Sequence, residues 1–170
     1  MRTLLLIRHA QPEVTPGVAA RTLAGRLAGA YALARLTSSD EPKAMETARI
    51  IAQELRLPAQ RDADLGEHRR AHVPYLSQED WHATMTRFFA QPDALVVGDE
   101  TARAALDRFS AAVTRGLAHT QEGDLALVTH GTVLTLFVAA HNPRVDALAF
   151  WRALALPDLV ALTLPNFHLT

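Results

Sequence analysis

The chain contains no cysteine, and this absence excludes several kinds of chemistry at once. Disulfide bonds, zinc sites built from thiolates and a cysteine nucleophile are all impossible. No apolar stretch approaches the roughly 20 residues that span a bilayer, and Leu4–Ile7 is too short for the apolar region of a secretion signal. We therefore expect a cytoplasmic protein that does not bind a membrane.

The chain also lacks an excess of basic residues. It has 17 basic and 18 acidic side chains, a formal net charge of -1, and no block of Lys or Arg. This balance argues against a nucleic-acid-binding protein that works by general basicity. Any anion must be recognised by a local group of cations. Lys43 stands out among the cations, because it is the only lysine in a chain with 16 arginines. Its ammonium is a compact charge, whereas an arginine guanidinium can form two parallel hydrogen bonds to one anion.

With 170 residues, 49% of them hydrophobic, the chain suits one compact domain with a sizeable core. We therefore predict a single domain over residues 1–170. Within it, residues 66–96 begin with a polar run and are expected to form a small lid or rim.

The order of apolar segments predicts an α/β fold. Leu4–Ile7 and Leu125–Val128 are aliphatic throughout and have no polar face, which is typical of strands covered on both sides. Further strands are expected over residues 31–37, 59–61 and 159–164, and helices over 19–28, from 42, from 77, from about 98 to 122, over 131–140 and over 146–152. This alternation predicts a three-layer sandwich, with a mostly parallel central sheet and helices on both faces.

Two histidines follow the ends of the buried strands. Arg8 and His9 come directly after one, and His130 follows the other. In open α/β sheets, ligands bind in the crevice outside the carboxyl ends of the strands. Lys43 lies in the first turn of the helix after the second strand and can reach the same edge. We therefore expect Arg8, His9, Lys43 and His130 to converge in a small cationic pocket.

A phosphoryl group is the natural ligand for such a pocket. Its oxygens need several donors at once, and charge-assisted hydrogen bonds from Arg are stronger than neutral ones. Gly131 and Thr132 begin a helix and can add backbone N–H groups as an anion site. Gln11, in the Pro- and Gly-rich loop after the first strand, is a further candidate for phosphate binding.

Taken together, these motifs resemble those of the histidine phosphatase superfamily, branch 1, the phosphoglycerate mutase-like proteins. The matching segments are Arg8-His9-Ala10 for the family's Arg-His-Gly, Ser38-Ser39 and the helix of Lys43 for its Ser-Ser turn and pocket arginine, Leu65-Gly66-Glu67 for its Leu-x-Glu, and His130-Gly131 for its second histidine. No single segment is specific, but the combination is.

The resemblance implies a role for each residue of the pocket. His9 is the nucleophile and forms a phosphohistidine that water cleaves, while Arg8, Lys43 and His130 stabilise the transferring charge. Glu67 is the expected proton donor to the leaving oxygen, with Asp64 and His68 as rival donors. The implied protein is an enzyme without a cofactor, a phosphomonoester hydrolase acting on a small phosphorylated metabolite or a phosphoprotein.

Two other functions stay open. Ala10 and Lys43 depart from the family's Gly and Arg, which is compatible with a catalytically weak protein that only binds phosphorylated ligands. A mutase-type phosphotransferase is less favoured, because the chain lacks the mutases' Trp-Glu-Gly pattern and is too short for their large insertions.

A metal site is not expected. His68 and His72 lie four residues apart and His82 ten further on, but Pro74 places the first two in a loop and no carboxylate pattern accompanies them. We therefore interpret these histidines as surface residues. The sequence predicts neither the substrate nor the oligomeric state.

Overall fold

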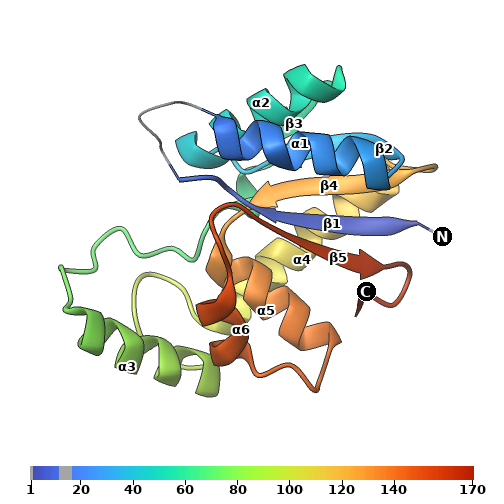
Figure 1. Ribbon diagram of the computed structural model, residues 1–170. Helices are drawn as coiled ribbons and strands as arrows, with labels where there is room; N and C mark the ends of the chain where they lie inside the picture. The colour runs from blue at the N-terminus through green and yellow to red at the C-terminus, as the bar shows by residue number, and fades with distance from the viewer. Residues whose placement is uncertain (1, 12–16) are drawn as a thin grey trace.

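A computed structural model describes residues 2–11 and 17–170 and shows a central sheet between two layers of helices (Figure 1). The strands are β1 (Thr3–Arg8), β2 (Leu33–Ser38), β3 (Ala59–Arg61), β4 (Asp124–Thr129), β5 (Asp158–Thr163) and β6 (His168–Leu169). The helices are α1 (Val18–Ala30), α2 (Pro42–Leu55), a short 3₁₀ helix η1 (Ala63–Leu65), α3 (Gln78–Ala90), α4 (Ala102–Ala118), α5 (Gly131–His141) and α6 (Ala147–Ala153).

The sheet has six strands in the order β3-β2-β4-β1-β5-β6. The strands β1 to β4 run parallel, whereas β5 lies antiparallel to β1 and β6 antiparallel to β5. The predicted mostly parallel sheet is therefore confirmed. The two-residue strand β6 and the helix η1 were not predicted from the sequence, because both are too short to show a periodic pattern.

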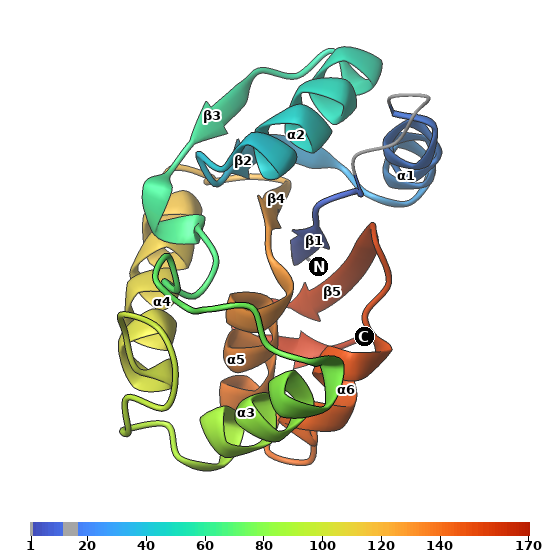
Figure 2. The ribbon, with the colours of Figure 1, turned by 90° about the vertical axis from the view of Figure 1, so that its left-hand side faces the viewer.

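Both faces of the sheet are covered, as Figure 2 shows, with α1 and α2 on one side and α3 to α6 on the other. Leu5 and Ile7 of β1 pack in the core beneath α1 and α2. Leu4 and Leu6 point the other way, into the core beneath α3 to α6. All six residues of β4 are buried. The absence of a polar face on these strands thus has the physical cause inferred from the sequence.

Most predicted boundaries agree with the structure to within a few residues. Ser77 caps α3 by accepting a hydrogen bond from the N–H of Asp80, as its sequence pattern indicates. Helix α4 begins at Ala102 and ends at Ala118, so the predicted helix was too long at both ends.

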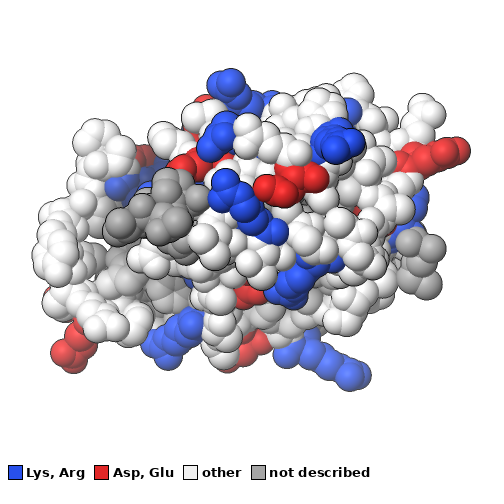
Figure 3. Space-filling model, turned by 45° about the horizontal axis from the view of Figure 1, so that its top comes forward, with Lys and Arg blue, Asp and Glu red and all other residues white. Residues whose placement is uncertain are grey.

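Charges are scattered over one face of the molecule. On the face shown in Figure 3, basic side chains lie between acidic and uncharged ones. Among the residues that the structure describes, no helix is both long and apolar enough to cross a membrane.

Asp124 connects the beginnings of β1, β2 and β4 by hydrogen bonds, at the end of the strands opposite to the two histidines. Its carboxylate accepts hydrogen bonds from the N–H of Thr3 at 2.7 Å and from the N–H of Ala32 at 2.9 Å. The side chain is thus an acceptor for backbone groups that no strand partner satisfies.

We expect Asp124→Ala to lower the free energy of unfolding by about 1 to 3 kcal/mol, because it leaves N–H donors without a partner. Urea unfolding measures this loss. Asp124→Asn, which keeps an acceptor oxygen, should lose less. Any catalytic activity per folded molecule should stay unchanged, and an activity loss at full stability would contradict a purely structural role.

Candidate active site

His9 continues β1 by one residue and stands beside His130. Its N–H donates to the carbonyl of Thr129 at 3.0 Å, and the two imidazole rings lie 5.0 Å apart between centroids. His9 Nδ1 lies 2.9 Å from the carbonyl oxygen of Ala10. A carbonyl only accepts, so Nδ1 carries the proton and Nε2 of the neutral ring has a free lone pair.

The environment of His9 favours this neutral ring. Burial lowers the pKa of His9 most; the carbonyl of Ala10 opposes this, while the positive charges of Lys43 and Arg8 lower the pKa further. The net shift is downward, so His9 is neutral at pH 7.

His130 is the N-cap residue of α5 and is almost completely buried, with 3% of its surface exposed. Its Nε2 lies 2.7 Å from Ser39 Oγ and 3.4 Å from Glu41 Oε1. Burial is the main cause that lowers the pKa of His130, against the opposing charges of Glu67 and Glu41. This histidine is therefore also neutral at pH 7.

Arg8 passes close over the beginning of α5. Its Nη1 donates to the carbonyl of Leu154 at 2.7 Å, and a Cβ atom at Gly131 would lie 3.2 Å from Arg8 Nε. Gly131 therefore permits the close approach of the guanidinium. Among the described residues, Nη2 of Arg8 has no hydrogen-bond partner and can serve an anion.

Lys43 lies in the first turn of α2 with an exposed side chain. Its ammonium is close enough to lower the pKa of both His9 and His130. Within the described residues it forms no ion pair, so its charge is open to an anion beside the two histidines. The structure thus brings Arg8, His9, Lys43 and His130 to one edge of the sheet, as the strand ends predict.

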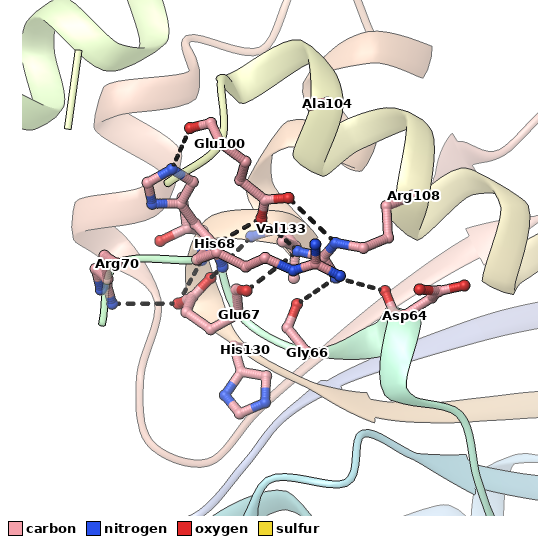
Figure 4. Close-up of polar contacts among 12 residues, drawn as sticks. Asp64, Gly66, Glu67, His68, Arg70, Glu100, Ala104, Arg108, His130 and Val133 are labelled. Carbon is pink, nitrogen blue, oxygen red and sulfur yellow. Dashed lines mark hydrogen bonds and ion pairs between the residues drawn. The ribbon is translucent and has the colours of Figure 1, made fainter. Parts of the chain in front are cut away.

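Glu67 points at the beginning of α5 and accepts from its backbone (Figure 4). The carboxylate accepts hydrogen bonds from the N–H groups of Thr132 at 3.2 Å, Val133 at 3.3 Å and His68 at 2.9 Å. The N–H of Thr132, which the sequence suggested for phosphate, is therefore given to Glu67. A carboxylate at a helix N-terminus is stabilised by the helix dipole in the same way as a bound anion.

The surroundings of Glu67 favour its ionised form. Burial alone would raise the pKa of this carboxyl, but the charge of Arg70, with Nη2 3.6 Å from Oε2, lowers it. Backbone hydrogen bonds add to the same effect, and the pKa lies below its usual value. In the ligand-free protein Glu67 is a carboxylate at pH 7.

Three polar residues that hold the site together were not assigned to it from the sequence. Ser39 and Glu41 flank His130, and Glu41 Oε1 also accepts from the N–H of Glu67 at 2.7 Å. Thr47 Oγ1 accepts from the N–H of Ala10 at 3.0 Å, which fixes the backbone after His9. Ser39 and Glu41 lie between β2 and α2, and Thr47 lies within α2. The sequence signal that could have identified them is that this segment follows the C-terminal end of a strand.

A buried ion pair holds the loop of Glu67 in place (Figure 4). Arg108 of α4 donates to the carbonyls of Asp64 at 2.8 Å, Gly66 at 3.0 Å and Glu67 at 3.1 Å. The same guanidinium pairs with Glu100 at 2.6 Å, and the two side chains are only 10% and 8% exposed. The pair therefore fixes the position of the backbone from which the Glu67 side chain extends.

The two rival proton donors are occupied elsewhere. His68 is buried, not at the surface as predicted: its Nε2 donates to the carbonyl of Glu100 at 2.8 Å and its ring packs on Phe88 at 4.6 Å between centroids. The carbonyl of Glu100 satisfies Nε2 of the buried ring, whereas Nδ1 is buried and has no hydrogen-bond partner among the described residues. Asp64 forms a partly exposed ion pair with Arg115 at 2.7 Å. Neither side chain is directed at His9 by these contacts.

Three further expectations from the sequence concern Gln11, a metal site and the exposure of His72. Gln11 is exposed and makes no contact that would place it at the histidines. Most of the loop that follows it, residues 12–16, lies outside the described residues. Among the described residues, no group of three or more His, Asp or Glu side chains is placed to hold a metal ion. His72 is exposed, as expected, and lies 3.3 Å from Asp99.

We expect Arg108→Met to lower the free energy of unfolding by about 3 to 5 kcal/mol, because it leaves the buried Glu100 carboxylate without its partner. Adding Glu100→Gln should restore part of the loss, since the uncompensated charge is then gone. Urea unfolding at pH 7 measures both. The exposed pair of Arg103 on α4 with Asp93 in the preceding loop provides the control: Arg103→Met should cost at most about 1 kcal/mol.

The same prediction has a pH dependence. Burial raises the pKa of Glu100, but hydrogen bonds and charge from Arg108 lower it below its usual value. The stabilisation is therefore complete above the unfolded pKa of about 4.3 and is lost as the pH falls through the lower folded value. A difference between wild type and Arg108→Met that stayed constant down to pH 3 would contradict this account.

Comparison with known proteins gives the family. A profile of the histidine phosphatase superfamily (branch 1) matches residues 17–167. This range begins after His9, so the pairing of β1 with β4, not the profile, brings the first histidine to the site. No curated protein sequence matches the chain.

Similar solved structures include Bacillus stearothermophilus YhfR, with 20% identity, a TM-score of 0.76 and coverage of 100% of this chain and 95% of that one. A phosphoserine phosphatase variant from Entamoeba histolytica in complex with phosphoserine has 15% identity, a TM-score of 0.74 and coverage of 100% and 94%. A mycobacterial glucosyl-3-phosphoglycerate phosphatase in complex with VO3 has 22% identity, a TM-score of 0.71 and coverage of 96% and 93%. These likenesses establish the fold, and the profile match over most of the chain shows that it belongs to the histidine phosphatase superfamily (branch 1).

Proposed function

We propose that this protein is a phosphomonoester hydrolase that works through a phosphohistidine at His9. The observation that carries the proposal is the pair of imidazoles 5.0 Å apart, one of which has its Nδ1 proton committed to the carbonyl of Ala10. This arrangement leaves the lone pair of Nε2 free for attack at phosphorus. The names of similar proteins, among them a phosphoserine phosphatase, agree with this reaction class.

The reaction takes two displacements. Nε2 of His9 attacks the phosphorus in line, an N–P bond forms and the bond to the ester oxygen breaks. Water then attacks the phosphohistidine: a P–O bond forms, the N–P bond breaks, a proton of the water passes to the Glu67 carboxylate, and inorganic phosphate and the neutral imidazole are released. Arg8, Lys43 and His130 bind the phosphoryl oxygens and stabilise the charge of the transition state. The route requires no cofactor.

Glu67 is the proposed donor to the leaving oxygen, and it must first gain a proton. A phosphate dianion in the pocket raises the pKa of a neighbouring carboxyl by like-charge repulsion. A bound substrate therefore favours the protonated form, which the ligand-free protein disfavours. Hydrolysis of esters whose leaving groups are stable anions depends little on proton donation by Glu67.

A protein that only binds phosphorylated ligands is the second candidate, because Lys43 supplies one ammonium where the family's pattern has a bidentate guanidinium. A mutase-type phosphotransferase is a third. Both are distinguished from a hydrolase by whether inorganic phosphate is released.

We expect His9→Ala to abolish phosphate release from p-nitrophenyl phosphate and to abolish acid-labile, base-stable labelling of the protein by a ³²P-phosphomonoester. The reason is that Nε2 of His9 is the attacking atom, whereas Nε2 of the neighbouring His130 lies 2.7 Å from Ser39 Oγ and is engaged there. His168→Ala, which removes an exposed histidine from β6, is the matched control and should retain both signals. Full turnover by His9→Ala would overturn the proposal, and phosphate binding by wild type without turnover would favour the binding protein.

Replacing Glu67 should affect substrates according to their leaving group. We expect Glu67→Gln to slow hydrolysis of glycerol 2-phosphate by about a hundred- to ten-thousandfold, the usual contribution of proton donation, and that of p-nitrophenyl phosphate much less. Steady-state kcat on the two substrates measures this. Asp64→Asn is the control, because the pair of Asp64 with Arg115 lies partly exposed. An equal loss on both substrates would show that Glu67 acts by structure alone.

A further inference from the structure

A cavity of about 360 Å³ has no role in the mechanism above, although Arg70 of its lining contacts Glu67. It is lined by Arg70, Val73, Pro74, Tyr75, Leu76 and Trp81, and we call it the Trp81 cavity. All six residues belong to the segment 66–96, which the sequence predicted as a rim of the active site. The volume exceeds that of a bicyclic aromatic ring.

Arg70 connects the Trp81 cavity to the catalytic groups. Its guanidinium carbon lies 4.9 Å above the centre of the Trp81 ring, while Nη2 lies 3.6 Å from Glu67 Oε2. Glu67 in turn shifts the pKa of both His9 and His130, so it lies close to both rings. Figure 4 shows Arg70 and His130 both close to Glu67. The cavity therefore begins one side chain away from the proposed proton donor.

The geometry of the reaction sets the direction of the leaving group. In an in-line displacement the leaving oxygen departs on the side opposite to the attacking Nε2 of His9. A leaving oxygen that receives its proton from Glu67 must lie beside that carboxyl. A leaving group that continues from Glu67 past Arg70 would reach the residues that line the Trp81 cavity.

The lining of the cavity suits a flat apolar group. Proline, valine, leucine and two aromatic rings form its wall, and a guanidinium stacked on Trp81 offers a flat cationic surface. Tyr75 is 98% exposed, so its ring contacts almost nothing in the ligand-free protein. An apolar ring in the cavity would gain contact with that ring and remove apolar surface from water.

The contacts of Glu67 point to the same leaving groups. Three backbone N–H groups and Arg70 stabilise it as a carboxylate, and these interactions oppose the effect of the substrate's charge on its protonation. Aryl oxides are far more stable anions than alkoxides and leave with less protonation. Both the wall of the cavity and the state of the acid therefore favour aryl esters.

We propose that the Trp81 cavity is the leaving-group subsite and selects phosphomonoesters whose leaving group is a flat aryl or heteroaryl ring system. The inference rests on the proposed function of His9. It adds Tyr75, Trp81 and Arg70 as residues that determine specificity.

The test compares 2-naphthyl phosphate with phenyl phosphate, whose leaving groups have similar acidity but different ring area. We expect wild type to prefer the naphthyl ester in kcat/KM by about tenfold, as the extra buried apolar area implies. Tyr75→Ala should reduce this preference severalfold while kcat/KM for glycerol 2-phosphate stays within about twofold. Because Tyr75 is exposed, this variant removes no folding contact.

Two variants serve as controls. Tyr75→Phe keeps the ring and should keep the preference. Leu95→Ala removes another exposed apolar side chain, 64% exposed and outside the cavity, and should also keep it. Equal kcat/KM for the two aryl esters in wild type, or a preference for phosphoserine over both, would overturn the subsite.

Binding to the His9→Ala variant separates this proposal from the one on which it rests. Calorimetry with the two aryl phosphates should show the naphthyl ester binding about tenfold more tightly, and Tyr75→Ala should remove most of that difference. If wild type hydrolyses neither ester but this difference is present, the proposed reaction fails and the subsite stands. If both esters bind equally, the subsite fails whatever the activity.

Discussion

The site depends on the register between β1 and β4. Arg8 lies opposite Thr129, so that His9 and His130, the next residue of each strand, leave the sheet at the same level. A shift of one residue would turn every side chain to the opposite face. Because both strands are buried on both sides, apolar patterning alone sets this register weakly. Polar contacts at the strand ends define it: Asp124 accepts from the N–H of Thr3 at one edge, and Thr129 accepts from the N–H of His9 at the other.

Permanent cations, not histidines, provide the positive charge of the pocket. Burial keeps the pKa of His9 and of His130 low, so both rings are neutral near pH 7. In the proposed mechanism, attraction of a phosphate therefore comes from Arg8 and Lys43. This division suits nucleophilic catalysis, since a protonated His9 would have no lone pair for phosphorus while the guanidinium and ammonium stay charged throughout.

The sequence was sufficient to predict the site residues that come directly after strands. It was not sufficient to predict contacts between segments that lie far apart in the chain. His9, His130 and Lys43 could be placed because parallel strands end at one edge of the sheet. The bonds from Arg108 to the carbonyls of Asp64, Gly66 and Glu67 join α4 to a loop more than forty residues earlier, and no local pattern encodes them. His68 illustrates the same limit. It lies in a polar run that favours exposure, yet its ring is buried against Phe88, where Nε2 bonds to the carbonyl of Glu100.

In the proposed mechanism, binding of phosphate and protonation of Glu67 are linked. The carboxylate accepts hydrogen bonds from N–H groups in the first turn of α5. A phosphate beside His9 and His130 brings its own negative charge to that helix end, where it can compensate the dipole in place of the carboxylate. Glu67 is then less favoured as an anion and gains the proton that the leaving oxygen requires. Proton donation would thus be confined to the substrate complex, and Arg70, which contacts Glu67 and Trp81 together, would make the acid responsive to the leaving group.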